Sequence, residues 1–361
     1  MIRQIFIESF LMINHEIKLN SKLFDGEVER ISMRAGFGEG LVQAAMRDKK
    51  IVGLCADLAE STYMDSFKNK FPDRFIEVGV AEQNLVTVAS GMAAAGKIPF
   101  VGSYAVFSPG RNWEQIRTTI CYNNAPVKIV GSHAGLNVGA DGGSHQALED
   151  IALMRVLPRM VVVSPCDAIE ARKATMAMAK TDSPTYIRLA REKSAVITTE
   201  ETPFTIGKAQ ILFRSGVKNQ AGRNNDQHSK RIDHESCLDI GIIATGAMVY
   251  RALHVAKKLD EEGKKVAVMN LSTIKPLDED AIIKLAHEAR AFVTIEEHQI
   301  AGGMGSVVAE CLAKHYPIPI EYVGVNDLFG QSGTPRELME HYGLSEKAVY
   351  EAANRAMLRK L

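Results

Sequence analysis

The residue whose surroundings most favour chemistry is Glu82. It lies in the run Val78-Gly79-Val80-Ala81-Glu82-Gln83-Asn84, where a β-rich segment ends, a glycine permits a sharp turn and an apolar helix begins. Glu82 is the only charged side chain from Val78 through Gly96. An acidic residue in the first turn of a helix also complements the helix dipole, so its position alone has a structural explanation. The apolar setting adds the hypothesis of a desolvated functional carboxylate.

A glycine-rich loop carries a second group of reactive side chains. Its sequence is Asp141-Gly142-Gly143-Ser144-His145-Gln146, and it follows a β-rich run that ends near Gly131. His145 could move protons, because imidazole titrates near neutral pH. The alternative is a turn followed by a helix cap, in which the histidine has no chemical role.

Two aromatic side chains, Tyr104 and Phe107, follow another predicted strand in the segment Ser103-Tyr104-Ala105-Val106-Phe107. Aromatic rings stack on planar ligands, and stacking adds to the gain from apolar burial. Aromatics at this spacing are also common in an ordinary hydrophobic core. The spacing alone therefore leaves both interpretations open.

Together these segments resemble the cofactor-binding segments of thiamine diphosphate enzymes of the transketolase family, and the resemblance extends over nearly the whole chain. It implies that Glu82 hydrogen-bonds the pyrimidine ring nitrogen of the cofactor and favours its imino tautomer. It also implies that Tyr104 and Phe107 pack against the pyrimidine ring, with Phe107 the closer contact, and that Asp57 lies near the cofactor. At Gly110 the chain departs from many transketolases, which have a tyrosine there.

The same resemblance implies a sugar phosphate site. The loop at 141–146 is similar to the transketolase signature D-G-x-T-H-Q, with serine in place of threonine, and implies that Asp141 and His145 address sugar hydroxyls. Four scattered residues match the positions that hold the terminal phosphate: Arg34, Ser61, His133 and Arg191. Two guanidinium forks, a hydroxyl and an imidazole suit a phosphate dianion, although each residue alone is an ordinary surface residue.

One part of a full-length transketolase is missing from this sequence. Such enzymes hold the diphosphate of the cofactor through Mg2+, with a G-D-G motif and paired asparagines, and this chain contains no G-D-G. Without that acid, Asn123-Asn124 and Asn224-Asn225 lack the oxygen-ligand context of a magnesium site. The resemblance therefore implies the C-terminal subunit of a split transketolase, with no metal ligand of its own. Thiamine diphosphate is expected to lie between this chain and an N-terminal subunit that holds the diphosphate and Mg2+, in an α2β2 heterotetramer.

The implied activity is transfer of a two-carbon ketol unit from a ketose phosphate to an aldose phosphate. Two related enzymes share the Glu82 context, namely the β subunit of a 2-oxoacid dehydrogenase and a detached half of deoxyxylulose phosphate synthase. The phosphate residues argue against the first, because a short 2-oxoacid has no terminal phosphate, and the loop at 141–146 argues against the second. A non-catalytic regulatory homologue is the remaining alternative, and the retention of the candidate site residues argues against it.

Positioning these residues requires a parallel sheet. From about Ile31 to Arg191, short β-rich runs alternate with helix-length segments, which predicts a parallel α/β sheet. The predicted strands are Ile51–Cys55, Phe75–Val78, Ile98–Gly102, Val127–Gly131, Met160–Val163 and Thr185–Leu189, and the predicted helices are Glu82–Ala95, Trp113–Cys121 and Ala168–Ala179. Ser61 and His133 follow two of these strands, and loops at strand carboxyl ends commonly form α/β sites.

A second, smaller α/β domain is predicted from about Leu238 onwards. Its predicted strands are Asp239–Ala244, Lys265–Met269, Phe292–Ile295 and Ile318–Val323. The run Arg214–Ser236 between the two domains has almost no apolar residue and cannot offset its ordering entropy. We therefore expect an N-terminal arm at 1–30, a pyrimidine-binding domain at 31–213, a mobile polar linker or insertion at 214–237 and a transketolase C-terminal domain at 238–361.

Composition narrows the class of protein. The 361 residues include 43 Lys plus Arg and 43 Asp plus Glu, so no net field recruits nucleic acid or an anionic membrane. The five cysteines are odd in number, widely spaced and without a C-x-x-C pair, which argues against a disulfide framework or a structural zinc. No export signal is visible, and no apolar run approaches the roughly 18 residues of a membrane span. We expect reduced thiols and a cytoplasmic protein.

Overall fold

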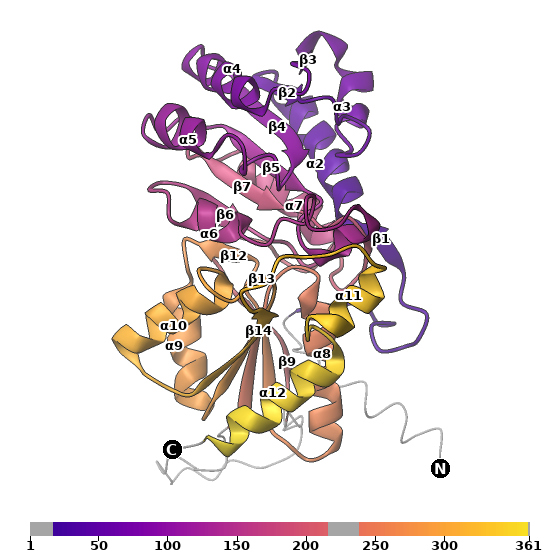
Figure 1. Ribbon diagram of the computed structural model, residues 1–361, viewed down its shortest axis with the longest axis vertical. Helices are drawn as coiled ribbons and strands as arrows, with labels where there is room; N and C mark the ends of the chain where they lie inside the picture. Colours follow the sequence, from indigo (N-terminus) through magenta and orange to yellow (C-terminus); the bar gives the residue numbers. More distant parts are fainter. Residues whose placement is uncertain (1–16, 216–237, 360–361) are drawn as a thin grey trace, which may run out of the picture.

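The computed structural model describes residues 17–215 and 238–359. Two α/β units lie one above the other, the first built around a seven-stranded sheet and the second around a five-stranded sheet (Figure 1). Most of the expected N-terminal arm, and residues 216–237 of the expected polar linker, lie outside the described residues.

The first sheet is parallel apart from one edge strand. In spatial order its strands are β12 (Thr273–Lys275), β6 (Val161–Val163), β7 (Thr185–Arg188), β5 (Lys128–Ser132), β4 (Ile98–Tyr104), β2 (Ile51–Cys55) and β3 (Phe75–Glu77). The edge strand β12 is antiparallel to β6. Every residue of β2, β5 and β7 is buried, as is typical of parallel strands covered by helices on both faces.

Helices cover the two faces of this sheet. One face packs against α2 (Met33–Arg47), α3 (Asp65–Lys70) and α7 (Ala168–Met178), and the other against α4 (Glu82–Ala94), α5 (Trp113–Gln115) and α6 (Asp150–Arg155). A π-helical turn at Ile116–Cys121 continues α5. Gly36, inside α2, permits close packing on α7, because a Cβ there would overlap the carbonyl oxygen of Ala168.

The second sheet has the order β14 (Ile320–Val325), β13 (Phe292–Gln299), β10 (Ile240–Ala244), β11 (Val266–Asn270) and β9 (Gln210–Arg214), with β9 antiparallel to β11. Helices α8 (Met248–Glu261) and α12 (Glu346–Leu358) pack on one face, and α9 (Glu279–Glu288) and α10 (Met304–His315) on the other. The short helix α11 (Pro335–His341) and the antiparallel pair β1 (Arg30–Ser32) and β8 (Lys193–Ala195) complete the elements that matter for the site.

The predicted α/β fold with two parallel or mixed sheets is confirmed. All ten predicted strands are present, with ends that agree to one or two residues except for β13, which continues to Gln299. The sequence analysis missed the pair β1 and β8 and the strands β9 and β12. Strand β9 precedes the polar segment but joins the second sheet, and β12 follows it but joins the first, so sheet pairing does not follow the boundary expected at 213.

Two further observations concern the described part of the chain. None of its helices is long and apolar enough to cross a membrane. Cys55, Cys121, Cys166 and Cys311 are buried free thiols, and Cys237 lies outside the described residues.

Candidate active site

The candidate site lies where the strands of the first sheet end. Strands β2, β3, β4, β5 and β7 are parallel, so the loops that follow them meet at one edge of the sheet. This carboxyl edge is the usual location of ligand sites in α/β proteins. Five of the ten predicted site residues lie shortly after one of these strands, namely Asp57, Ser61, Glu82, His133 and Arg191.

Glu82 is the first residue of α4, and only 4% of its surface is exposed. Gly79, which has φ +73°, turns the chain between β3 and this helix. The buried side chain of Asn112 fixes the helix start, because its Nδ2 donates a 2.9 Å hydrogen bond to the carbonyl oxygen of Glu82. The carboxylate is thus held in a largely dry position at a helix N-terminus, where the helix dipole favours negative charge.

The ion-pair partner of Glu82 is Arg111, which the sequence analysis did not identify. The Nη1 of Arg111 lies 3.4 Å from Oε1 and 3.3 Å from Oε2 of Glu82. The guanidinium carbon also lies 4.4 Å from the centre of the Phe107 ring. The arginine side chain is 53% exposed. The signal in the sequence was the departure from the family pattern at Gly110, directly before Arg111.

Aromatic rings connect this carboxylate to the predicted sugar phosphate site. Tyr104 stacks on His133 with ring centres 3.8 Å apart, and Phe107 lies 5.9 Å from Tyr104 in a near-parallel orientation. His145 packs edge-on against both, 5.4 Å from Phe107 and 6.4 Å from Tyr104. Phe107 therefore faces the guanidinium of Arg111, whereas Tyr104 supports His133.

Arg34, at the start of α2, gathers the other three predicted phosphate residues. Its Nη1 donates a 2.6 Å hydrogen bond to the carbonyl oxygen of Ser61, and its Nη2 donates a 2.7 Å bond to that of Arg191. Nη1 also lies 3.5 Å from Nε2 of His133. The Nε of Arg34 is buried without a hydrogen-bond partner among the described residues. The four residues converge, although Ser61 contributes its carbonyl group rather than its hydroxyl to these contacts.

His133 is held in its neutral form. It is buried, has φ +54°, and its Nδ1 lies 2.8 Å from Oγ of Ser132. Burial, assisted by the positive charges of Arg34 and Arg191, lowers the pKa of His133 to about 3. At neutral pH His133 is therefore an uncharged imidazole, and the positive charge of the predicted phosphate site comes from the guanidinium groups of Arg34 and Arg191.

Arg191 is tied to the second half of the molecule through Asn137. The Oδ1 of Asn137 accepts a 2.5 Å hydrogen bond from the backbone N–H of Arg191. The Nδ2 and backbone N–H of Asn137 both donate to Oε1 of Glu297 in β13, at 2.9 and 2.7 Å. Burial raises the pKa of Glu297. Two adjacent acids in a buried strand, Glu296 and Glu297, were the only sign of this contact in the sequence.

A buried ion pair reinforces the same junction. The Nε of Arg188 lies 2.9 Å from Oδ2 of Asp150, and the hydroxyl of Tyr186 donates a 2.6 Å hydrogen bond to the same oxygen. The Nη2 of Arg188 donates a 2.8 Å hydrogen bond to the carbonyl oxygen of Glu297. Since Arg188 ends β7 three residues before Arg191, this pair fixes the strand from which the phosphate arginine projects.

The glycine-rich loop also lies against the second half. Gln146 donates a 3.0 Å hydrogen bond to the carbonyl oxygen of Gln331, and a Cβ at Gly143 would lie 2.5 Å from the carbonyl oxygen of Gly330. Oγ of Ser144 lies 3.0 Å from Nδ1 of His145 and helps to orient the imidazole that packs on Phe107. The structure therefore brings His145 into the site.

Asp141 and Asp57 are less closely connected to this group. Both residues are exposed, and neither carboxylate makes a hydrogen bond or ion pair with the residues that the structure describes. Asp57 has φ +58°, and its backbone N–H donates a 2.7 Å bond to Oε1 of Glu77. The same oxygen accepts a 3.0 Å bond from the N–H of Gly79. Glu77, another residue that the sequence analysis missed, thereby ties the loop of Asp57 to the turn before Glu82.

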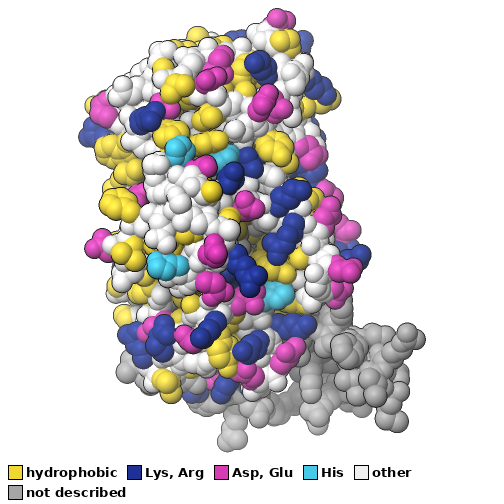
Figure 2. All heavy atoms as spheres, turned by 45° about the vertical axis from the view of Figure 1, so that its right-hand side comes forward, with side chains coloured by type: hydrophobic (Ala, Val, Ile, Leu, Met, Phe, Trp, Pro, Cys, Tyr) yellow, Lys and Arg dark blue, Asp and Glu magenta, His cyan; other side chains and the backbone are white. Residues whose placement is uncertain are grey.

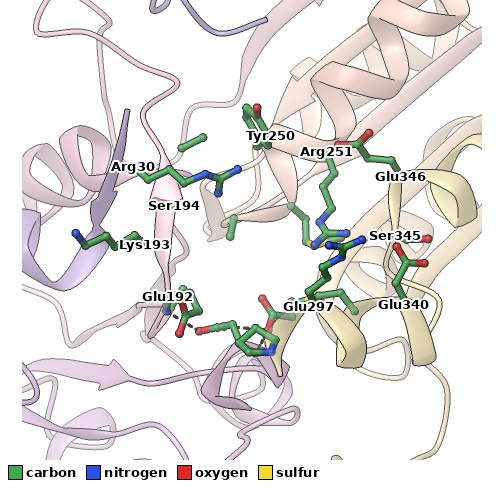
Figure 3. Close-up of a pocket in the computed structure, with 18 of the residues that line it drawn as sticks. Arg30, Glu192, Lys193, Ser194, Tyr250, Arg251, Glu297, Glu340, Ser345 and Glu346 are labelled. Carbon is green, nitrogen blue, oxygen red and sulfur yellow. Dashed lines mark hydrogen bonds between the residues drawn. The ribbon is translucent and has the colours of Figure 1, made fainter. Parts of the chain in front are cut away.

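A cavity of about 680 Å3 lies between β8 and the helices α8, α11 and α12 (Figure 3). Asn137 and Glu297 line it, together with side chains of both charge signs such as Arg30, Arg251 and Glu346. Figure 2 likewise shows basic and acidic side chains interspersed over the face that it presents. The mixed charge of the cavity favours no single class of ligand.

Comparison with known proteins gives a consistent family. The transketolase pyrimidine binding domain matches residues 29–195, and the transketolase C-terminal domain matches residues 231–349. A 6-deoxy-6-sulfo-D-fructose transketolase subunit of Clostridium sp. (strain MSTE9) is 37% identical over 93% of this chain and 98% of its own length. The chain belongs to the transketolase family. A putative transketolase C-terminal section of Methanocaldococcus jannaschii is 40% identical over 88% of this chain and 93% of its own length.

Two further relatives are a solved structure and a longer enzyme that this chain matches over only part of its length. A solved structure described as a split gene transketolase, inactive beta4 tetramer, is 41% identical, with a TM-score of 0.81 over 92% of this chain and 100% of that chain. A 1-deoxy-D-xylulose-5-phosphate synthase of Halothermothrix orenii is 33% identical over 88% of this chain, which spans 47% of that enzyme. The predicted pair of transketolase domains and the resemblance to split transketolases are confirmed.

The residues present fit the pyrimidine half of thiamine diphosphate, the cofactor that the transketolase family uses. A buried carboxylate at Glu82 stands beside the ring of Phe107, and Oγ of Ser103 is buried at the end of β4 without a hydrogen-bond partner in the described residues. A carboxylate and an aromatic face are what a ring nitrogen and a planar ring require. Within residues 17–215 and 238–359, no group of three or more His, Cys, Asp or Glu side chains is arranged to hold a metal ion.

Proposed function

We propose that this chain is the C-terminal subunit of a transketolase that moves a two-carbon ketol unit from a ketose phosphate to an aldose phosphate. The observation that carries the proposal is the convergence of Ser61, His133 and Arg191 on Arg34, next to the aromatic rings that lead to Glu82. Two guanidinium groups that are separated from the cofactor carboxylate by aromatic rings suit a substrate whose anionic end is remote from the reacting carbonyl.

Each residue has a distinct role in this proposal. Glu82 hydrogen-bonds the pyrimidine ring of thiamine diphosphate, and Phe107 packs against that ring. When bound, the cofactor supplies a carbon nucleophile and an electron sink for cleavage of the bond next to the carbonyl group. His145 holds or moves a proton at a sugar hydroxyl. Asp141, which lies in the same loop, hydrogen-bonds another hydroxyl of the sugar.

The phosphate residues fix the register of the substrate and take no part in bond-making. Arg34 and Arg191 supply charge, and His133 supplies a neutral hydrogen-bonding group, because its pKa of about 3 leaves it uncharged at working pH. Positioning of this kind lowers the barrier by orienting the reacting carbon before the chemical step. Tyr104 acts indirectly, by stacking on His133. Asp57 lies near the cofactor in this proposal and is the least supported member of the site.

The partner is an N-terminal transketolase subunit that holds the diphosphate and Mg2+, and the assembly is an α2β2 heterotetramer. Support comes from the relatives, which are named as a subunit or a C-terminal section and which this chain matches over 93–98% of their length. The related solved structure is described as an inactive beta4 tetramer. A chain of this kind is expected to be active only in the complex.

Within this function, the anionic end of the substrate could be a phosphate or a sulfonate. The relative from Clostridium is named for a sulfonated sugar, and a sulfonate is also a tetrahedral anion that guanidinium groups bind through paired hydrogen bonds. The dianionic phosphate makes fuller use of the two positive charges of Arg34 and Arg191, so a sugar phosphate is the proposed substrate.

The test is reconstitution with the N-terminal subunit encoded in the same genome, followed by separate assays with three donors. With ribose 5-phosphate as acceptor, xylulose 5-phosphate should be turned over, 6-deoxy-6-sulfofructose more slowly, and pyruvate alone not at all. Turnover of pyruvate alone would support the β subunit of a 2-oxoacid dehydrogenase, and pyruvate with glyceraldehyde 3-phosphate would support the synthase. A complex that neither binds thiamine diphosphate nor turns over any donor would support the regulatory homologue.

A further inference from the structure

Arg111 occupies both contacts that the cofactor's pyrimidine ring is expected to use. Its Nη1 lies 3.3–3.4 Å from the two carboxylate oxygens of Glu82. Its guanidinium carbon lies 4.4 Å from the centre of the Phe107 ring. No other hydrogen bond to the Glu82 carboxylate occurs within the described part of the chain, so one side chain covers the carboxylate and the aromatic face together.

A guanidinium group is a good mimic of an aminopyrimidine. Both are planar, carry N–H donors at their edge and stack on aromatic faces. Glu82 is 4% exposed, and a buried carboxylate without a partner is strongly unfavourable. Arg111 therefore compensates Glu82 when no pyrimidine ring is present.

The contact is built so that it can be broken. Charge-assisted N–H···O bonds are usually about 2.7–2.9 Å long, and both contacts of Arg111 with Glu82 are longer than that. The arginine side chain is 53% exposed, so it can leave into solvent.

The backbone on either side of Arg111 is fixed. A Cβ at Gly110 would overlap the carbonyl oxygen of Val106, so only glycine fits at this position. On the other side, buried Asn112 donates to the carbonyl oxygen of Glu82 at 2.9 Å and to Oγ of Ser108 at 3.1 Å. Only the side chain of Arg111 is free to swing.

We propose that Arg111 is a placeholder for the pyrimidine ring of the cofactor: in the free subunit it pairs with Glu82 and covers Phe107, and the cofactor must displace it to bind. This proposal rests on the proposed function, because it takes the incoming ring to be the pyrimidine of thiamine diphosphate. Its consequence is that the free chain binds the pyrimidine weakly. Cofactor loading is thereby coupled to assembly with the partner, whose diphosphate site supplies the remaining binding energy.

The test uses the isolated full chain and the pyrimidine fragment 4-amino-5-hydroxymethyl-2-methylpyrimidine, with affinity measured by NMR titration. If the closed arrangement holds about nine-tenths of the molecules, removing it tightens the apparent Kd by roughly tenfold. Arg111→Ala should show that gain. Arg117→Ala, which removes an exposed arginine from the helical turn that follows α5, should bind as the wild type does. Unchanged or weaker binding by Arg111→Ala would overturn the proposal and make Arg111 a contact of the bound cofactor or a bystander.

A second variant covers the case in which Arg111→Ala fails to fold because Glu82 is left without a counter-charge. Arg111→Lys keeps the charge but cannot lie flat on Phe107, so it should fold and bind the fragment a few-fold more tightly than the wild type. No binding by either variant also overturns the proposal. Thiamine diphosphate binding by the complex with the partner subunit is measured in parallel. If the complex binds thiamine diphosphate while the isolated variants bind the fragment no more tightly than the wild type, only the proposed role of Arg111 is refuted. If the complex binds no thiamine diphosphate, the proposed function is refuted as well.

Discussion

The Nη2 of Arg34 donates a 2.7 Å hydrogen bond to the carbonyl oxygen of Arg191, which lies 157 residues further along the chain. Through this bond one arginine positions the backbone of the other, so the two guanidinium groups are set relative to each other before any substrate arrives. Preorganised charges of this kind do not have to be ordered during binding, because the free energy of ordering them is spent when the chain folds.

The first prediction concerns Arg191. In the reconstituted complex, Arg191→Ala should raise KM for phosphorylated sugars by roughly 10- to 100-fold, because a hydrogen bond to a charged group contributes about 1.5–3 kcal/mol. KM for unphosphorylated analogues should change far less. Steady-state kinetics on matched pairs of sugars measures the difference, with Arg117→Ala as the control. Equal effects on both classes of sugar would remove Arg191 from the phosphate site.

The second prediction concerns the junction between Asn137 and Glu297. Asn137→Ala should lower the free energy of unfolding by about 2–4 kcal/mol, because the carboxylate of Glu297 loses one of its two donors and the N–H of Arg191 loses its acceptor. Asn137→Asp has the same shape and should be at least as damaging, since a second carboxylate would then face Glu297. Urea unfolding of the isolated chain measures both.

Asn69→Ala is the control for this pair of variants. Asn69 is an exposed residue of α3, and its removal should change the free energy of unfolding by less than about 0.5 kcal/mol. If Asn137→Asp were as stable as the wild type, the amide would not be the group that holds the two halves together.

The fold was largely predictable from the sequence, and the exceptions share one physical cause. Strands such as Ile51–Cys55 are buried on both faces and bounded by turns. The apolar run that identifies such a strand therefore lies within the strand itself. Strands β9 and β12 are edge strands of five and three residues, and β1 and β8 are three-residue strands that form a separate pair. All four run antiparallel to their neighbours. Their pairing depends on partners far away in the sequence, and no local pattern records it.

The candidate site was predictable only where residue types carried meaning by themselves or by resemblance. The convergence of Arg34, Ser61, His133 and Arg191 agrees with the expectation that they form one group. Arg111 and Asn137 were missed because each acts through a contact with one residue elsewhere in the chain, Glu82 or Glu297. An arginine or an asparagine in a loop is an ordinary residue until its partner is known.

The third prediction concerns pH and His133. The folded state lowers the pKa of His133 from its usual 6.5 to about 3, so between these values the unfolded chain binds more protons than the folded one. Stability from this group is therefore fully present above about pH 6.5 and is lost as the pH falls towards 3. The advantage of the wild type over His133→Asn in free energy of unfolding should shrink on acidification over this range.

Urea unfolding at several pH values measures this advantage, with His341→Asn as the control at an exposed histidine. The control should run parallel to the wild type. A constant difference between the wild type and His133→Asn from pH 7 to pH 4 would mean that His133 titrates alike in both states.

The last prediction concerns Glu82 itself. Glu82→Gln keeps the shape of the side chain but cannot share a proton with a ring nitrogen, so kcat of the complex should fall by roughly 10^2- to 10^4-fold, as for loss of a general acid or base. KM for the donor sugar should change little, because the phosphate residues lie on the far side of Tyr104. Glu82→Asp retains the carboxylate but shortens its reach, and should restore part of kcat if the carboxylate is the acting group. An activity of Glu82→Gln close to that of the wild type would return Glu82 to the structural explanation, an acid that complements a helix dipole and the charge of Arg111.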